Sequence, residues 1–169
     1  MPPVPVPLTN DHFEMKRKEV YKAPTFVDRT GRAGSDPYAK NLLEFRSRIE
    51  QGLELPPKFY RNGIGTTTDD LLQHTGVKHV HLGATKSDVL LFVEEFDDFV
   101  VLLEIAGHDQ NFWEVPVGAT LKKHHLDSLE VHLPGFAATA SAAREKAKKR
   151  QRIAAAGAKA AKPSGRRQP

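Results

Sequence analysis

Alternating apolar and polar positions predict β-strands in the middle of the chain. In VKHVHLG, over residues 77–83, this alternation places His79 and His81 on the same face of a strand. Two nearly continuous apolar runs follow, SDVLLFVEEF at 87–96 and DFVVLLEIAGH at 98–108. The acidic residues between these runs predict that the two strands form a hairpin. Continuous apolar runs indicate central strands covered by other parts of the chain.

A helical spacing of apolar residues predicts a helix in SDPYAKNLLEFRSRIEQG, at residues 35–52. The apolar stripe consists of Tyr38, Leu42, Leu43, Phe45 and Ile49. We expect Ser35 or Asp36 to cap its beginning and Gly52 to end it. A second, short helix is expected at 69–74, within a long loop.

Prolines and charges divide the rest of the chain. Residues 1–34 are expected to form a Pro-rich extended arm, in which the piece before residue 28 fits either a short helix or a strand. Residues 35–136 form the predicted α+β domain, a small curled antiparallel sheet with flanking helices. Within it, TLKKHHLDSL at 120–129 fits a helix, and SLEVHL at 128–133 fits a strand. Residues 137–169 are expected to form a helical to disordered Ala/Lys/Arg-rich tail.

The net charge of +4 hides an uneven distribution. Ten Lys/Arg and one Asp/Glu lie in 141–169, which leaves fifteen Lys/Arg and twenty Asp/Glu in 1–140. The tail is therefore expected to bind nucleic acid in a salt-dependent way, although it also fits a solubilising segment or one that orders on a partner. The candidate RNA-binding residues of the tail are Arg144, Lys148, Lys149, Arg150 and Arg152.

The chain contains no cysteine, which excludes a disulfide scaffold, a thiolate zinc site and a cysteine nucleophile. The N-terminus has no signal-peptide pattern, and no apolar run is long enough to span a membrane. We therefore expect a cytoplasmic protein without a membrane partner.

Two imidazoles on one strand face, His79 and His81, allow three interpretations. They fit a metal site with His108, Glu104 or Asp88 as a third ligand. They also fit a catalytic or RNA-facing role, or a structural role in the core. The loop carboxylates Asp69 and Asp70 are further candidates, although capping the short helix is their simplest function.

Several short motifs together resemble the YafO-type toxins of bacterial toxin–antitoxin systems. These motifs are GLELPPKFYRN, TTTDD, VKHVHLG and the hairpin that ends near His108, and together they cover about 36–108. Thr68 departs from the family pattern, which has an aromatic residue there. The positions that match the family are Phe59, Arg61, Asp69, Asp70, His79, His81 and His108.

This resemblance implies a RelE-like fold and a ribosome-dependent mRNA interferase, with the ribosome, mRNA and a cognate antitoxin as partners and no cofactor. Metal-free RNA cleavage needs a base, an acid and cations at the phosphate. His79 or His81 is the candidate proton-transfer residue, and His108 is a further catalytic candidate. Arg61 and Lys78 are the candidate phosphate ligands, although alternation puts Lys78 on the strand face opposite the histidines.

Two other function classes fit the same sequence. One is a non-catalytic binding module, in which the tail grips nucleic acid or protein and the sheet is only a scaffold. The other is a metal-dependent enzyme that uses the three histidines as ligands.

Overall fold

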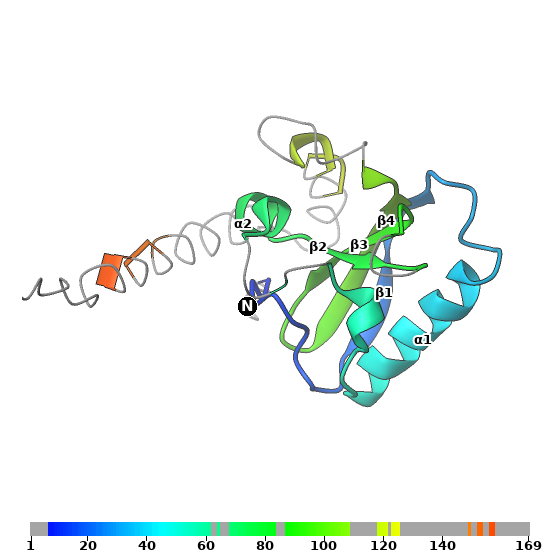
Figure 1. Cartoon of the computed structure of the whole chain (residues 1–169), viewed down its shortest axis with the longest axis horizontal. Helices are drawn as coiled ribbons and strands as arrows, with labels where there is room; N and C mark the ends of the chain where they lie inside the picture. Colours follow the sequence, from blue (N-terminus) through cyan, green and yellow to red (C-terminus); the bar gives the residue numbers. More distant parts are fainter. Residues whose placement is uncertain are drawn as a thin grey trace, which may run out of the picture.

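The structure is a computed structural model of the chain. It describes residues 7–61, 64, 68–83, 87–108, 118–121 and 123–125, together with positions 149, 152, 153, 156 and 157. The fold is α+β, with an open four-stranded mixed sheet in the order β1-β4-β3-β2 (Figure 1). The elements are β1 (Glu19–Asp28), α1 (Tyr38–Gln51), the 3-10 helix η1 (Pro57–Phe59), α2 (Asp70–Thr75), β2 (Lys78–His81), β3 (Leu90–Glu95) and β4 (Phe99–Ala106).

The three strands predicted in the middle of the chain are confirmed as β2, β3 and β4. β2 pairs antiparallel with β3, with His79 opposite Phe92. β3 in turn pairs antiparallel with β4. The predicted hairpin closes where the Phe96 N–H donates to the Phe99 carbonyl oxygen at 2.8 Å. Every residue of β3 is buried, as its continuous apolar run indicates.

The prediction of a purely antiparallel sheet is wrong, because β1 joins the sheet parallel to β4. Glu19 pairs with Phe99 at one end of this ladder and Asp28 with Ile105 at the other. The piece that fitted either a helix or a strand is therefore a strand. Its register shifts between Lys22 and Val27, and this stretch contains a proline. Such an irregular edge strand lacks the strict alternation that identifies strands in sequence.

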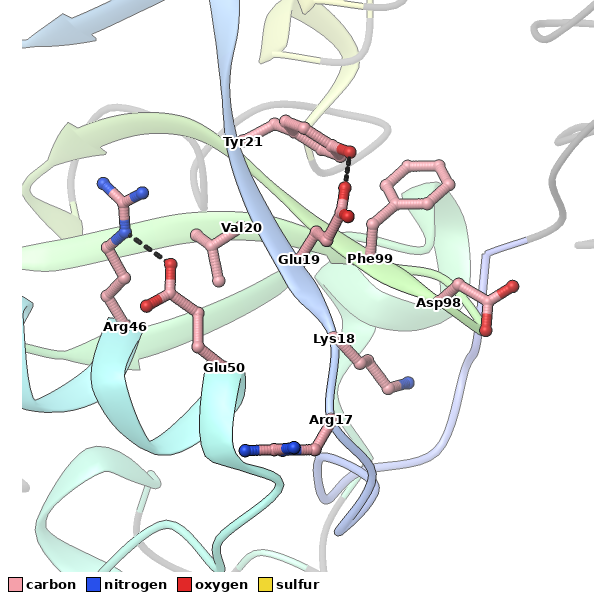
Figure 2. Close-up of a pocket in the computed structure, with 9 residues that line it drawn as sticks. All are labelled: Arg17, Lys18, Glu19, Val20, Tyr21, Arg46, Glu50, Asp98 and Phe99. Atoms are coloured by element: carbon pink, nitrogen blue, oxygen red, sulfur yellow. Dashed lines mark hydrogen bonds and ion pairs between the residues drawn. The ribbon is translucent and has the colours of Figure 1, made fainter.

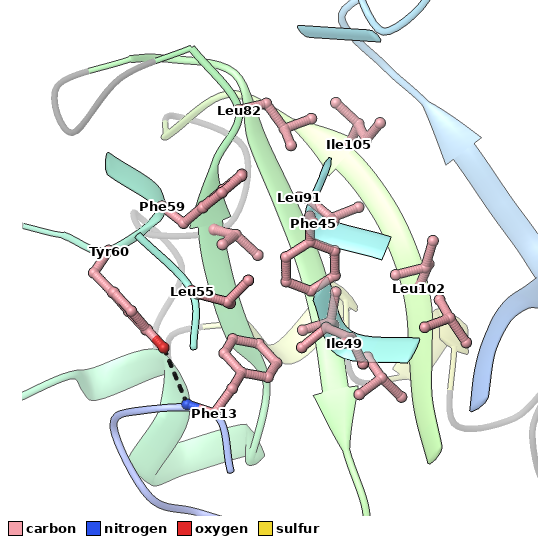
Figure 3. Packing of buried hydrophobic residues seen from close by; sticks show 14 of the residues in the cluster. Phe13, Phe45, Ile49, Leu55, Phe59, Tyr60, Leu82, Leu91, Leu102 and Ile105 are labelled. Atoms are coloured by element: carbon pink, nitrogen blue, oxygen red, sulfur yellow. Dashed lines mark hydrogen bonds between the residues drawn. The ribbon is translucent and has the colours of Figure 1, made fainter. Parts of the chain in front are cut away.

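Helix α1 covers one face of the sheet and packs Phe45 and Ile49 into the larger core (Figure 3). Gly52 ends the helix in the left-handed conformation, with φ of 69°, as predicted. The expected capping by Ser35 or Asp36 does not occur. The N-cap is Pro37 and makes no side-chain hydrogen bond, and the helix start is instead closed by the Ala39 N–H, which donates to the Ser35 carbonyl oxygen at 2.9 Å.

Helix α2 lies on the opposite face, where Leu71 packs in a second core with Phe92 and Leu103. Of the segment predicted to hold either a helix at 120–129 or a strand at 128–133, residues 119–121 and 123–125 are helical, and Leu121 contributes to this core. The predicted strand at 128–133 lies outside the described residues. The helical part approaches α2 closely at Gly118, where φ is 75° and an added Cβ would lie 2.4 Å from Leu71 Cδ1. The two cores cover both faces of the sheet, so the ends of the strands lie at the edges of the domain.

Candidate functional site

The sheet topology brings several candidate residues to one end of the sheet. Strands β1, β2 and β4 all run in the same direction, and β3 runs against them. Consequently β1, β2 and β4 end where β3 begins. His81 is the last residue of β2, His108 follows β4 by two residues, and Asp88 precedes β3 by two. We call this end of the sheet the carboxyl rim.

The three candidate histidines cluster beside the carboxyl rim. The ring centres of His81 and His108 are 5.6 Å apart, as are those of His79 and His81. The rings of His79 and His108 are 6.5 Å apart. His79 and His81 share the strand face opposite α1, as the alternation predicts, and they meet a histidine that lies 27 positions or more further along the chain.

His108 is the accessible member of this cluster and is paired with Asp88. Its side chain is 44% exposed, whereas that of His79 is 5% exposed. Asp88 Oδ1 lies 3.0 Å from His108 Nδ1 and accepts the His108 backbone N–H at 3.1 Å. These two contacts hold the pKa of Asp88 below its usual value. Because an ionised carboxylate only accepts hydrogen bonds, Nδ1 carries the proton and Nε2 is the basic atom of the neutral ring.

His79 lies in a buried group with Asp69 and Arg61. Asp69 Oδ2 is 3.5 Å from both His79 Nδ1 and Arg61 Nε. Burial, together with the charges of His81, His108 and Arg61, lowers the pKa of His79 to about 3. His79 is therefore neutral at pH 7 and does not supply a proton there. The predicted catalytic role is better matched by the geometry of His108.

Asp69 also performs the helix-capping function that the sequence allowed. Its Oδ1 accepts the Leu72 N–H at 3.1 Å at the start of α2. Burial raises the pKa of this carboxyl, partly offset by the Leu72 hydrogen bond and by Arg61. The cavity between Asp69, His79 and Arg61 measures about 10 Å³, which is roughly the space of one water molecule. A substrate therefore has no room beside His79.

His81 is oriented by the loop that precedes β3. Its side chain is buried, with Nδ1 3.1 Å from the Ser87 carbonyl oxygen. Because a carbonyl oxygen only accepts, His81 Nδ1 is the donor. Ser87 directly precedes Asp88, so one short segment positions both His81 and His108.

Lys78 lies away from the histidines, on the opposite face of β2. It is buried with Lys18, and both ammonium groups pair with the Glu95 carboxylate. The Lys18 Nζ to Glu95 Oε1 distance is 2.8 Å. Burial lowers the pKa of Lys78, although Glu95 opposes this shift. This lysine is committed to the interior and is not placed to hold a phosphate at the carboxyl rim.

The remaining predicted residues are dispersed. Asp70 is exposed in the first turn of α2, and Phe59 is fully buried in the core beside α1. Lys149 and Arg152 are exposed at helical positions. Arg144, Lys148 and Arg150 lie outside the described residues.

A second polar chain lies on the sheet face that carries His79. Glu104 Oε2 is 2.9 Å from His125 Nε2 and 3.3 Å from Arg29 Nε. His125 Nδ1 is 2.7 Å from the Thr25 hydroxyl. Glu104 stands out in sequence as a charge inside an apolar strand, but nothing local connects it with Thr25 or His125. These contacts tie β1, β4 and the helical residues around 125 together.

A cleft of about 850 Å³ lies at the other end of the sheet, where β1 and β4 begin (Figure 2). Its walls carry charges of both signs, and two of them are paired with each other: Arg46 donates to Glu50 at 2.8 Å. The lining residues are Arg17, Lys18, Glu19, Val20, Tyr21, Arg46, Glu50, Asp98 and Phe99. The cleft is therefore separate from the histidine cluster.

Within the part of the chain that the structure describes, no three His, Asp or Glu side chains are arranged to hold a metal ion. The same residues include no helix long and apolar enough to cross a bilayer. Comparison with protein families, with curated proteins and with solved structures found no match to this chain.

Proposed function

We propose that this protein is an endoribonuclease of the ribosome-dependent mRNA interferase kind, with His108 as its proton-transfer residue. The observation that carries this proposal is the His108–Asp88 pair at the carboxyl rim. It presents an exposed imidazole whose Nδ1 is fixed by a carboxylate, which is the arrangement that general-base catalysis uses.

The reaction that this pair supports is transesterification of RNA. His108 Nε2 takes the proton of a ribose 2′-hydroxyl, and the 2′-oxygen attacks the adjacent phosphorus. The bond to the 5′-oxygen breaks, and that oxygen takes a proton from water at the rim. The products are a 2′,3′-cyclic phosphate and a 5′-hydroxyl. Asp88 stabilises the imidazolium that forms when His108 takes the proton.

The other two histidines support this assignment as positioning residues. His81 packs its ring 5.6 Å from that of His108 and takes its own orientation from Ser87. His79 stays neutral, so it does not repel the imidazolium on His108. An exposed rim suits a polymer substrate that another macromolecule presents, and under this proposal, which follows the resemblance to YafO-type toxins, that macromolecule is the ribosome.

A RelE-like fold belongs to the same proposal. The antiparallel β2–β3–β4 sheet with helices on its two faces supports it, whereas the parallel edge strand β1 is an addition to the predicted arrangement. Under this proposal a cognate antitoxin covers the domain and the basic tail holds RNA.

Inducible expression in bacteria tests this function. We expect the wild type to stop growth and bulk translation, and His108→Ala to remove the effect. His74→Ala is the matched control, because His74 is exposed on α2 and its ring bonds only the carbonyl of its own helix at Asp70 among the contacts described. A soluble, harmless wild type would contradict the proposal.

The binding-module alternative is favoured by one observation, the ten Lys/Arg in 141–169 on an acidic body. It predicts salt-sensitive nucleic-acid binding that disappears when 141–169 are deleted, without toxicity of the full chain.

A further inference from the structure

The loop after β1 carries two arginines, Arg29 and Arg32, to the carboxyl rim. Strand β1 runs parallel to β4, so both strands leave the sheet at the same end (Figure 1). The pairing continues past the strand, because the Arg29 N–H donates to the Ile105 carbonyl oxygen at 2.8 Å. The loop that follows Arg29 therefore starts beside the end of β4, which leads to His108.

The Asp28 carboxylate holds this loop in a fixed shape. It accepts the Thr30 N–H at 2.9 Å, the Thr30 hydroxyl at 2.7 Å and the Ala33 N–H at 2.9 Å. It also accepts the N–H of Gly31, whose φ of 66° requires glycine. Burial opposes the charge on Asp28, but these hydrogen bonds prevail and lower its pKa. The carboxylate is thus the centre of a tight turn.

This turn fixes the backbone of Arg32 on both sides. The Arg32 N–H donates to the Thr30 hydroxyl at 3.1 Å, and the Arg32 carbonyl oxygen accepts the Ser35 hydroxyl at 2.8 Å. The Arg32 side chain is exposed. Because the backbone of Arg32 is already fixed, the loop itself need not be ordered when the guanidinium binds an anion.

The two arginines differ in what holds their charge. Arg29 lies 3.3 Å from the buried Glu104 carboxylate, so its charge stabilises the interior. The charge of Arg32, in contrast, acts on Asp88 at the carboxyl rim. The two His108 hydrogen bonds lower the pKa of Asp88 most, and the Arg32 charge adds to this lowering. Arg32 lies on the rim loop that begins beside Ile105, and its charge acts on the same carboxylate that His108 contacts.

We propose that Arg32, held by the Asp28 turn beside the His108–Asp88 pair, binds the RNA phosphodiester on which His108 acts. This inference rests on the proposed function for its substrate. A guanidinium offers two parallel N–H groups to a phosphate, which fixes the position of the phosphorus as well as its charge. Arg32 replaces Arg61 and Lys78 as the proposed phosphate ligand, because the Lys78 side chain is buried, that of Arg61 is only 16% exposed, and both are paired with carboxylates.

The test measures binding at His108 itself, because the basic tail binds nucleic acid elsewhere on the chain. The His108 imidazole NMR signals of the full chain are assigned by their loss in His108→Gln. The protein is then titrated with a 2′-deoxy dinucleotide monophosphate, which lacks the attacking hydroxyl, and separately with inorganic phosphate. We expect the dinucleotide to shift the His108 signals, and Arg32→Ala to weaken this binding about tenfold.

Two further variants test whether the binding depends on the guanidinium of Arg32. Arg32→Lys keeps the charge but not the paired donors, so we expect an intermediate loss. Arg17→Ala removes an equally exposed arginine from the cleft at the opposite end of the sheet and should leave the His108 titration unchanged. No shift at His108, equal weakening by Arg17→Ala and Arg32→Ala, or a response to inorganic phosphate alone would each overturn the proposal.

Cleavage assays on the same proteins separate this inference from the proposed function. An active wild type whose dinucleotide binding survives Arg32→Ala would overturn the Arg32 site alone. Dinucleotide binding that depends on Arg32, in a protein that cleaves no mRNA, would support the site and count against the interferase function.

Discussion

His108 and Asp88 lie 20 residues apart in sequence, yet Asp88 Oδ1 contacts both the backbone N–H and Nδ1 of His108. The backbone contact fixes where the carboxylate sits, and the ring contact fixes the tautomer. Together they make Nε2 the basic atom of the neutral His108 ring, and the side chain that carries it is 44% exposed.

Asp88→Asn tests the role of this carboxylate. Asparagine keeps the size and can still accept the Nδ1–H, but it removes the charge that stabilises the imidazolium. We expect the cleavage rate to fall about tenfold to a hundredfold, since the imidazolium loses its charged partner. The rate is measured for wild type and variant, and an unchanged rate would show that Asp88 only shapes the loop.

Glu95→Gln tests the assignment of Lys78 to the interior. The substitution leaves the buried ammonium groups of Lys78 and Lys18 without their shared carboxylate. We expect the free energy of unfolding to fall by about 3–5 kcal/mol in urea denaturation. Asp98→Asn is the control, because the Lys16–Asp98 pair is exposed and its loss should leave the free energy of unfolding almost unchanged. Similar small losses in both variants would contradict the assignment.

The lowered pKa of His79 predicts a pH-dependent stability. In the unfolded chain this histidine has its ordinary pKa of 6.5, whereas in the folded protein its pKa is about 3. The unfolded state therefore holds more protons in this window, and stability falls as the pH drops from 6.5 toward 3. At pH 5 the loss from His79 amounts to about 2 kcal/mol.

This prediction is checked by denaturation of the wild type and His79→Gln at several pH values. The variant should lose stability less steeply between pH 6.5 and 4 than the wild type. Parallel curves for the two proteins would mean that His79 titrates normally and is not held neutral by burial.

Two substitutions of Asp69 separate its role as the N-cap of α2 from the role of its negative charge. Asp69→Asn keeps an oxygen for the Leu72 N–H, whereas Asp69→Ala removes it. We expect the alanine variant to lose about 1–2 kcal/mol more than the asparagine variant in thermal or urea unfolding. Equal losses would show that the contacts of Asp69 with Arg61 and His79, and not the cap, stabilise this region.

The sequence predicts the local elements of this fold well, because strand and helix periods are local. The alternation in 77–83 correctly separates His79 and His81 from Lys78, and Gly52 ends the first helix as expected. The parallel edge strand β1 escapes such reasoning, since its partner β4 lies 80 positions away and its own pattern is interrupted by a proline and a register shift.

In the candidate site, too, local features can be predicted from the sequence and long-range contacts cannot. The three histidines are identifiable from their motifs, but which of them is accessible depends on burial by α2 and on the strand ends, and neither is local. The role of Asp28 is equally hidden, because DRTGRAGSDP reads only as a loop until its carboxylate is seen to accept four hydrogen bonds.

The most direct test of the central claim is cleavage mapping in a reconstituted bacterial translation reaction. Purified wild type, His108→Ala and His74→Ala are added at equal concentrations, and primer extension locates new mRNA ends. The account predicts cleavage by the wild type and His74→Ala, and a rate about 10²–10⁴-fold lower for folded His108→Ala. Equal cleavage by His108→Ala, or intact mRNA with a folded wild type, would contradict it.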